Sequence, residues 1–241
     1  MKLSNYKALT FDVYGTLIDW ETGIVEGLSP LVEKVERELS RDEILEAHAR
    51  HESTHQRYTP AKRYQALLPV VYRRLAEEWG VSVRWDECLA YGQSVKNWPA
   101  FPDSANALQY LKKHFKLVVL TNVDNDSFKY SNEKLNVEFD GVYSAEDIGS
   151  YKPFDRNFDY LIEMISSIGI TKDQILHTAE SMFHDHVPAN KHGLTSCHIY
   201  RRFDKQGFGA TMTPEVMPTY EFKFNSMADL VKAHQKELEN E

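Results

Sequence analysis

The stretch that most restricts the fold of this 241-residue chain is YKALTFDVYGTL, at residues 6–17. Its residues 8–11 are apolar or β-branched, and the run stops at Asp12, which Gly15 and Thr16 soon follow. This pattern predicts a short buried strand that opens into a turn. Ligands of open α/β sheets bind in the crevice beyond the carboxyl ends of the strands. Asp12 is therefore placed to act as a nucleophile or a metal ligand, or more simply as a helix cap or a solvated loop acid.

From Pro99 onwards, apolar runs alternate with amphipathic segments, which is typical of parallel strands covered by helices on both faces. The predicted strands are Ala8–Phe11, Leu117–Leu120, Gly141–Ser144, Ile175–Thr178, Ser196–Tyr200 and an edge strand at Tyr220–Phe224. The predicted helices of this part are Asp103–His114, Asp126–Leu135, Asn157–Ser167, Val187–His192 and Met227–Leu238, and residues 203–218 are predicted to be a long loop.

Residues 18–97 show no convincing strand pattern and are predicted to be helical. The candidate helices are Gly23–Glu38, Arg41–Tyr58, Ala61–Gly80 and Trp85–Asn97. The chain is therefore expected to be an α/β protein with a Rossmann-like, doubly wound parallel sheet. Residues 1–17 and 98–241 form this core, and residues 18–97 form a helical cap domain inserted above its crevice.

Charge and composition limit the partners of the chain. Its net charge is −8, from 28 basic and 36 acidic side chains, which disfavours binding to nucleic acid or to anionic lipid. Cys88 and Cys197 lie far apart and indicate neither a disulfide framework nor a zinc site. Neither a membrane-spanning run nor a signal-peptide pattern is present, so a cytoplasmic location is expected. A homodimer is the default expectation for the assembly.

The segment Asp12-Val13-Tyr14-Gly15-Thr16-Leu17 resembles the first motif of the haloacid dehalogenase superfamily, in which the aspartate is the nucleophile. Most phosphatases of that superfamily carry a second aspartate two residues on, which protonates the leaving group. Tyr14 occupies that position here, as in the L-2-haloacid dehalogenase branch. The resemblance also implies that Val13 and Tyr14 help to bind the substrate, through backbone N–H groups that follow the nucleophile.

Two further segments resemble the second and third motifs of the superfamily. Thr121 and Asn122 follow an apolar strand, and the resemblance implies that they hydrogen-bond the nucleophile and the substrate carboxylate; the simpler alternative is that Thr121 caps a turn. Lys152 stands directly before a proline, and its cation would favour the ionised form of Asp12. A lone lysine is otherwise most often a solvated surface group.

The fourth motif departs from the pattern of the haloacid dehalogenases. Glu180 and Asp185 fit two acids five residues apart, but those dehalogenases carry serine and asparagine where this chain has Glu180 and Met182. Asp185 is expected to orient Lys152 and to polarise the hydrolytic water. With Asp12 and Asp185, Glu180 would instead complete an oxygen-ligand site for Mg²⁺. Of the flanking histidines, at most one is expected to be functional, and His184 is predicted to lie at the surface.

The cap is expected to supply the remaining recognition. Residues 52–57 have a Glu-x-Thr-x-x-Arg spacing, which points to Arg57 as the arginine that faces the substrate and halide in the dehalogenases; most helical arginines are simply solvated. Trp20 and Trp98 would form an apolar wall that excludes water, or would be plain packing at the domain junction.

These patterns together predict a hydrolase that acts on carbon–halide bonds, converting a short L-2-haloalkanoic acid to the D-2-hydroxyacid through an aspartyl ester. Asp12, Thr121, Asn122, Lys152 and Asp185 are the expected catalytic residues. The substrate is a small anionic organic acid, and no cofactor is required. The alternatives are a Mg²⁺-dependent phosphomonoesterase, which Glu180 favours, and a catalytically idle protein that binds a metabolite or a protein partner.

Overall fold

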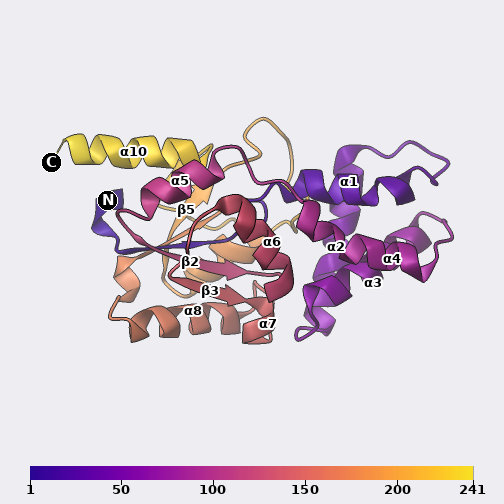
Figure 1. Ribbon diagram of the computed structural model, residues 1–241, viewed down its shortest axis with the longest axis horizontal. Coiled ribbons are helices and arrows are strands. Elements are labelled where there is room, and N and C mark those ends of the chain that lie inside the picture. Colours follow the sequence, from indigo (N-terminus) through magenta and orange to yellow (C-terminus); the bar gives the residue numbers. More distant parts are fainter. Residues whose placement is uncertain (241) are drawn as a thin grey trace.

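A six-stranded parallel sheet forms one end of the molecule, and a group of helices forms the other (Figure 1). The computed structural model describes residues 1–240. The strands lie in the order β3-β2-β1-β4-β5-β6, and every neighbouring pair is parallel. Their bounds are β1 (Ala8–Phe11), β2 (Lys116–Thr121), β3 (Gly141–Ser144), β4 (Ile175–Ala179), β5 (Thr195–Ile199) and β6 (Phe222–Phe224). This is the doubly wound α/β core that the sequence predicted.

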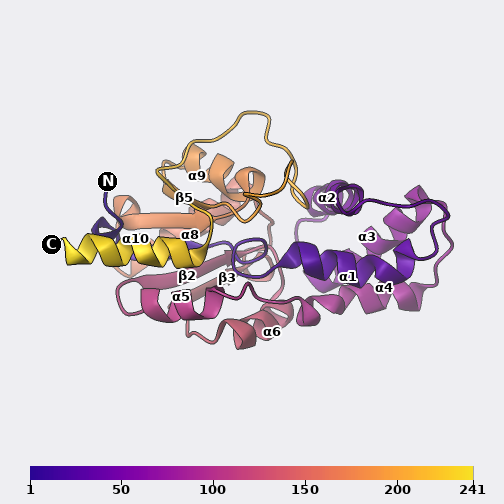
Figure 2. The same ribbon diagram turned by 90° about the horizontal axis from the view of Figure 1, so that it is seen from above.

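Helices α1 to α4 follow β1 and lie beyond the sheet, on the side of the molecule away from both termini (Figures 1 and 2). They are α1 (Trp20–Val32), α2 (Arg41–Tyr58), α3 (Tyr64–Glu78) and α4 (Trp85–Gly92), followed by a short 3₁₀ turn, η2 (Ser94–Asn97). The remaining helices are α5 (Ser104–Leu111), α6 (Asn125–Leu135), α7 (Ala145–Ile148), α8 (Asp155–Ser167), α9 (Val187–Lys191) and α10 (Met227–Glu239).

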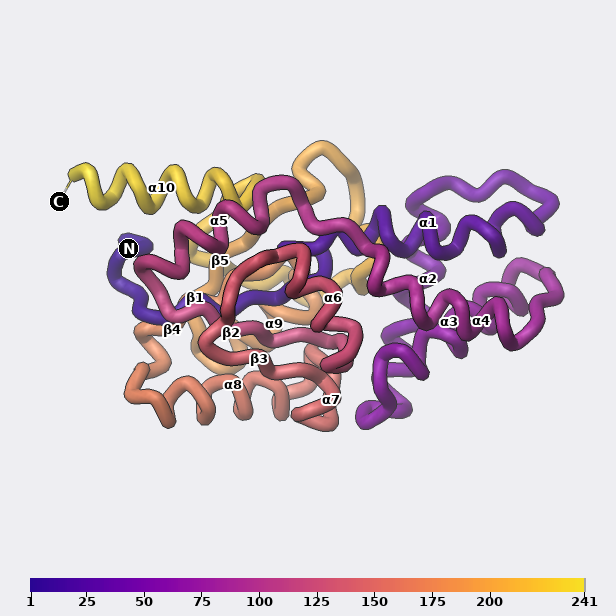
Figure 3. The backbone as a smooth tube through the Cα atoms, in the orientation of Figure 1, coloured from indigo at the N-terminus to yellow at the C-terminus, as the bar shows by residue number. Residues whose placement is uncertain are grey.

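Alternation along the central strands supplies two hydrophobic cores. Leu9 and Phe11 of β1 belong to a large cluster that also contains residues of α5 and α10. Ala8 belongs to a second cluster, with Phe158 and Leu161 of α8. Because successive side chains of a strand point to opposite faces, one short run of apolar residues packs both layers. In Figure 3, α5 and α10 lie on one side of the strands, and α8 lies on the other side.

The predicted strands and most helices are confirmed to within a few residues, but the first helix, predicted to reach Glu38, already ends at Val32. α1 begins at Trp20, three residues earlier than expected, because the Asp19 side chain accepts a hydrogen bond from the Thr22 N–H at 3.2 Å and caps the helix. The helix expected at Trp85–Asn97 divides into α4 and η2 around Gln93. β6 lies at the sheet edge, as predicted.

The chain order places the site. From β1, the strands β2 and β3 follow one another toward one edge of the sheet. The strands β4, β5 and β6 follow one another from β1 toward the opposite edge. The carboxyl ends of β1 and β4 therefore flank the point where the strand order reverses, which is where open α/β sheets bind ligands. Within residues 1–240, no helix is long and apolar enough to cross a membrane.

Gly23 allows α1 to pack directly on Trp98. A Cβ atom at Gly23 would lie 2.2 Å from Cγ of Trp98, whereas one at Gly27 in the same helix would lie 3.0 Å or more from its neighbours. We expect Gly23→Ala to lower the free energy of unfolding by about 1–3 kcal/mol through overpacking. Gly27→Ala is the matched control, since higher helix propensity offsets its milder contacts. Equal free energies of unfolding for the two variants in urea titrations would contradict this packing.

Candidate active site

Asp12 stands directly at the carboxyl end of β1. Its backbone N–H donates to the carbonyl of Thr178 at 3.1 Å, so the strand ladder holds the residue up to the point where the chain turns away. Gly15 follows with φ of 99°, a conformation that side chains disfavour, and a Cβ atom there would lie 3.0 Å from Nε1 of Trp20. The turn therefore needs glycine, and it leaves the carboxylate at the mouth of the crevice.

Lys152 forms ion pairs with Asp12 and Asp185, the two acids that were predicted to be catalytic. It lies in the loop between α7 and α8, and its Nζ donates to Oδ1 of Asp12 at 2.9 Å and to Oδ1 of Asp185 at 2.7 Å. All three side chains are buried, and that of Lys152 is 1 % exposed. The structure thus brings Asp12, Lys152 and Asp185 together from segments 140 and 33 residues apart.

The pKa values within this cluster reflect one cation shared by two carboxylates. Burial raises the pKa of Asp12, and Lys152 opposes this effect while Asp185 adds to it. Burial alone would lower the pKa of Lys152, but Asp12 and Asp185 outweigh it and raise the value. Burial alone would likewise raise the pKa of Asp185, yet Lys152 and His177 hold it well below its usual range. Lys152 therefore stays protonated, and Asp185 stays ionised.

The hydroxyl that donates to the Asp12 carboxylate belongs to a different threonine than predicted. Oγ1 of Thr16 donates to Oδ2 of Asp12 at 2.7 Å and also accepts the N–H of Glu180 at 2.9 Å. Oγ1 of Thr121 is buried and accepts the N–H of Val123 at 3.5 Å, which matches the turn-capping alternative. Thr16 lies in the turn itself, four residues after Asp12, so its hydroxyl reaches the carboxylate without another strand.

Asn122 reaches the cavity, but its amide holds the backbone of Lys152. Nδ2 donates to the Lys152 carbonyl at 3.1 Å, and Oδ1 accepts the Lys152 N–H at 2.7 Å. These two hydrogen bonds attach the loop that contains Lys152 to the carboxyl end of β2. One hydrogen of Nδ2 remains for a ligand, because an amide nitrogen has two donors.

His177 is a site residue that the sequence analysis missed. It is fully buried in β4, where Nε2 lies 3.0 Å from Oδ1 of Asp185 and Nδ1 lies 2.8 Å from Oγ1 of Thr10. The available signal was a histidine in the middle of a short, mostly apolar strand that pairs with the strand directly before Asp12. His177 does not line the cavity, but its hydrogen bond holds the Asp185 carboxylate in position.

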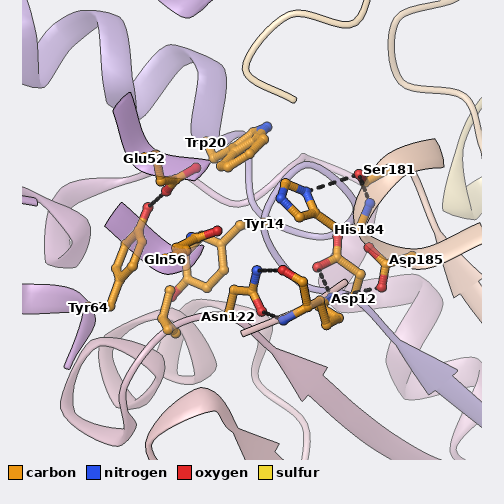
Figure 4. Close-up of a pocket in the computed structure, with 12 residues that line it drawn as sticks. Asp12, Tyr14, Trp20, Glu52, Gln56, Tyr64, Asn122, Ser181, His184 and Asp185 are labelled. Atoms are coloured by element: carbon orange, nitrogen blue, oxygen red, sulfur yellow. Dashed lines mark hydrogen bonds and ion pairs between the residues drawn. The ribbon is translucent and has the colours of Figure 1, made fainter. Parts of the chain in front are cut away.

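A cavity lies between this cluster and the cap (Figure 4). The space between its walls, including the part open to solvent, is about 370 Å³. The lining residues are Asp12, Tyr14, Trp20, Glu52, Gln56, Tyr64, Asn122, Val123, Lys152, Ser181, His184 and Asp185.

Aromatic side chains wall the cavity, as predicted for Trp20. Tyr14 also lines it, and Tyr14 Oη is 2.7 Å from Oγ of Ser131 in α6. Trp98 does not reach the cavity; it is buried behind Tyr14, with ring centroids 5.7 Å apart in an edge-to-face contact. The side chain of Val13 is buried in the main core, so only its backbone N–H is available to a ligand.

The prediction that Arg57 faces the substrate is corrected by the structure. Arg57 is exposed on α2 and does not line the cavity, and its guanidinium lies over the ring of Tyr58. The face of α2 that points at the cavity carries Glu52 and Gln56 instead (Figure 4). Residues four apart share a helix face, whereas the residue after Gln56 is turned about 100° away.

Glu180 does not join Asp12 and Asp185 at the cavity. It lines a second cavity on the other side of Trp20, with Glu21, Arg201, Arg202 and Lys205 among its neighbours. Burial raises the pKa of Glu180 to about 8, and Glu21 adds to this shift. Within residues 1–240, no group of three or more His, Cys, Asp or Glu side chains is arranged to hold a metal ion. The ligand set Asp12, Glu180 and Asp185 is therefore not assembled.

The two histidines of the fourth motif point in different directions, as predicted, but His184 is not at the surface. Residues Met182–His186 form a π-helical turn, and His184 is buried against the cavity, with Nδ1 3.2 Å from Oγ of Ser181. Burial lowers the pKa of His184 to about 4, so the ring is neutral near pH 7. His186 packs behind the turn, where it contacts Ser196 at 2.8 Å.

Glu52 is an unexpected acid in the cavity wall. Oη of Tyr64 donates to Oε1 of Glu52 at 2.6 Å, and burial raises the pKa of Glu52 to about 7. In the unfolded chain this carboxyl ionises near pH 4.5, whereas in the folded protein it stays protonated up to about pH 7. Glu52 therefore lowers the free energy of unfolding progressively as the pH rises from about 4.5 to about 7.

We therefore expect Glu52→Gln to raise the free energy of unfolding by about 1–3 kcal/mol at pH 8. At pH 4 the variant should change it little, since the carboxyl is then protonated in both states. Urea titrations at the two pH values measure this difference. A variant that is less stable than the natural protein at pH 8 would contradict the burial of an acid here.

The site thus holds a carboxylate at the end of a central strand, with a buried lysine and a second acid beside it, and such a carboxylate is a group that can act as a nucleophile. The comparison with known families gives the class of protein. A family model described as haloacid dehalogenase-like hydrolase matches residues 6–178. The chain belongs to this family.

Individual relatives are distant in sequence, but each match covers more than nine-tenths of the chain. HAD-hydrolase YfnB of Bacillus subtilis (strain 168) is 22% identical over 228 residues, which is 92% of this chain and 93% of that protein. The L-2-haloacid dehalogenase PA0810 superposes with a TM-score of 0.74 at 19% identity, covering 98% of this chain and 100% of that one. The L-2-haloacid dehalogenase of Xanthobacter autotrophicus superposes with a TM-score of 0.73 at 16% identity, covering 95% of this chain and 98% of that one. These structures share the fold.

Proposed function

We propose that this protein is a hydrolytic dehalogenase of short L-2-haloalkanoic acids. Asp12 attacks the carbon that bears the halogen from the rear, which forms an ester bond and releases the halide with the bonding electron pair. Water then attacks the ester carbonyl, frees the 2-hydroxyacid and restores Asp12. Because the first step inverts the carbon and the second leaves it untouched, an L-acid gives a D-hydroxyacid.

The environment of Tyr14 carries this proposal. An alkoxide leaving group needs a proton from a nearby acid, whereas a halide leaves without one. Tyr14 stands two residues after the nucleophile, and its hydroxyl is engaged with Ser131. Burial raises the pKa of Tyr14 far above its usual value, so its proton is tightly held. This position therefore suits a leaving group that departs as a stable anion.

Asp185 and Lys152 are suited to the hydrolytic step. Oδ1 of Asp185 is held by Lys152 and His177, while Oδ2 is buried and has no hydrogen-bond partner within the described residues. A water on Oδ2 would be oriented and polarised by this carboxylate as it attacks the ester. His184 Nε2 is likewise buried and unpartnered in the described chain, and it lines the same cavity.

The charge that develops on the ester oxygen needs donors near Asp12. Lys152 Nζ lies 2.9 Å from Oδ1 of Asp12, and the backbone N–H groups of Val13 and Tyr14 follow the nucleophile directly. The second hydrogen of Asn122 Nδ2 adds a further donor at the end of β2. Such donors stabilise an oxyanion and also bind the substrate carboxylate.

The structural relatives support the same reaction. The Xanthobacter autotrophicus dehalogenase has been described with chloropropionic acid covalently bound, and PA0810 is an L-2-haloacid dehalogenase. On the other side, the structure of YfnB is described as bound to magnesium. A Mg²⁺-dependent phosphomonoesterase is the second candidate for this chain, although Glu180 lies outside the cavity that holds Asp12. We propose that no cofactor is required.

Halide release separates the two candidates. The purified protein is incubated with L-2-chloropropionate, with and without EDTA, and chloride and the chirality of any lactate are measured. We expect chloride release that EDTA does not affect, together with D-lactate. Phosphate release from p-nitrophenyl phosphate that EDTA abolishes and Mg²⁺ restores, without chloride release, would overturn the proposal.

A further inference from the structure

The cap presents an acid, and not a base, to the reacting centre. Glu52 and Gln56 of α2, Tyr64 of α3 and Trp20 of α1 are the cap residues that line the cavity. Among all lining residues of the described chain, Lys152 is the only Lys or Arg. Its single charge is already shared by Asp12 and Asp185, so the lining offers no unpaired Lys or Arg to a second carboxylate of a substrate.

Glu52 is held in place and has a free acceptor. Its side chain is nearly fully buried, and Oε1 receives the hydroxyl of Tyr64 at 2.6 Å. Within residues 1–240, Oε2 forms no hydrogen bond, although the residue faces the cavity (Figure 4). This oxygen is not among the fully buried atoms that lack a partner, so it is open to the cavity and can accept a hydrogen bond from a ligand that brings a donor.

We propose that Glu52 selects substrates whose cap-facing end carries a hydrogen-bond donor, such as a hydroxyl or a carboxamide, and rejects those with a second carboxylate there. This inference rests on the proposed function in placing the reacting end of the substrate at Asp12. Gln56 tolerates either kind of group, because an amide both donates and accepts, whereas the hydroxyl of Tyr64 already donates to Glu52 and can only accept from a ligand. Glu52 is therefore the residue that decides between them.

Succinamate and succinate test this proposal through binding alone. The two acids are nearly isosteric and differ in one end group, an amide against a carboxylate, and neither carries a leaving group. Calorimetric titration at pH 8 is expected to show that the natural protein binds succinamate at least about tenfold more tightly than succinate. In Glu52→Gln, which keeps an acceptor for Tyr64 but removes the charge, the preference should fall to less than about threefold.

Glu46→Gln is the matched control, because Glu46 lies on the same helix but is exposed and away from this cavity. It removes the same charge and should keep the preference of the natural protein. Equal affinities of the natural protein for the two acids, no detectable succinamate binding, or an unchanged preference in Glu52→Gln would overturn the proposal.

Turnover of the chlorinated counterparts separates this inference from the proposed function. If 2-chlorosuccinamate releases chloride faster than 2-chlorosuccinate, and Glu52→Gln removes the difference, both hold. If neither releases chloride while the binding preference and its loss are observed, dehalogenation is wrong and the selection by Glu52 stands. If both release chloride equally and the two unreactive acids bind equally, dehalogenation stands and the selection is wrong.

Discussion

Asp12→Asn is expected to lower kcat for chloride release from L-2-chloropropionate by at least about 10⁴-fold. The amide oxygen still accepts from Lys152, while the NH₂ group replaces the oxygen that accepted from Thr16 and can donate to that hydroxyl instead, so the geometry at the end of β1 is retained. The amide is not a nucleophile, however, and no ester can form. Chloride release under saturating substrate measures the effect.

Two observations make the result of this substitution specific. The thermal unfolding midpoint of Asp12→Asn should stay near that of the natural protein, which separates lost chemistry from lost structure. Asp126→Asn changes an exposed carboxylate in the same way and should leave kcat unchanged. Asp12→Asn with kcat within tenfold of the natural protein would remove Asp12 from the reaction.

Lys152→Met is expected to lower the free energy of unfolding by about 3–5 kcal/mol and to abolish turnover. Methionine fills a similar volume but leaves Asp12 and Asp185 buried without their shared cation. The Coulomb repulsion between the two carboxylates then adds to their loss of solvation. Urea titration and chloride release measure the two effects on the same preparation.

Lys191→Met is the control for a lysine ion pair as such. Lys191 pairs with Asp155, but its side chain is 64% exposed, and such pairs contribute at most about 1 kcal/mol. If Lys152→Met were as stable as Lys191→Met, the buried ion pair would not hold the two acids as described.

The sequence was most informative where local pattern and function coincide. Ala8–Phe11 is short, apolar and followed by a turn, so both the strand and the position of Asp12 could be predicted from neighbouring residues. Lys152 and Asp185 were predicted through their resemblance to family motifs, and the ion pairs now show why they occur together. The helical segment after β1 was also predictable from its periodicity.

The residues that were missed are fixed by tertiary contacts. The orientation of α2 decides that Glu52 and not Arg57 faces the cavity, and spacing along one helix gives no information about that rotation. His177 reads as one polar residue in a strand until β4 is placed beside β1 and Asp185. Thr16 and Thr121 are both hydroxyls near strand ends, and only the path of the turn shows which one reaches Asp12.

The most direct test of the account is where oxygen from water goes in a single turnover. The protein in excess over a substrate from which it releases halide is allowed to react once in H₂¹⁸O, and the product and the peptide that contains Asp12 are analysed by mass spectrometry. Attack by Asp12 followed by hydrolysis at its carbonyl predicts unlabelled hydroxyacid and one ¹⁸O in Asp12. Labelled hydroxyacid with an unlabelled Asp12 would mean that water attacks the substrate directly and that Asp12 is not the nucleophile.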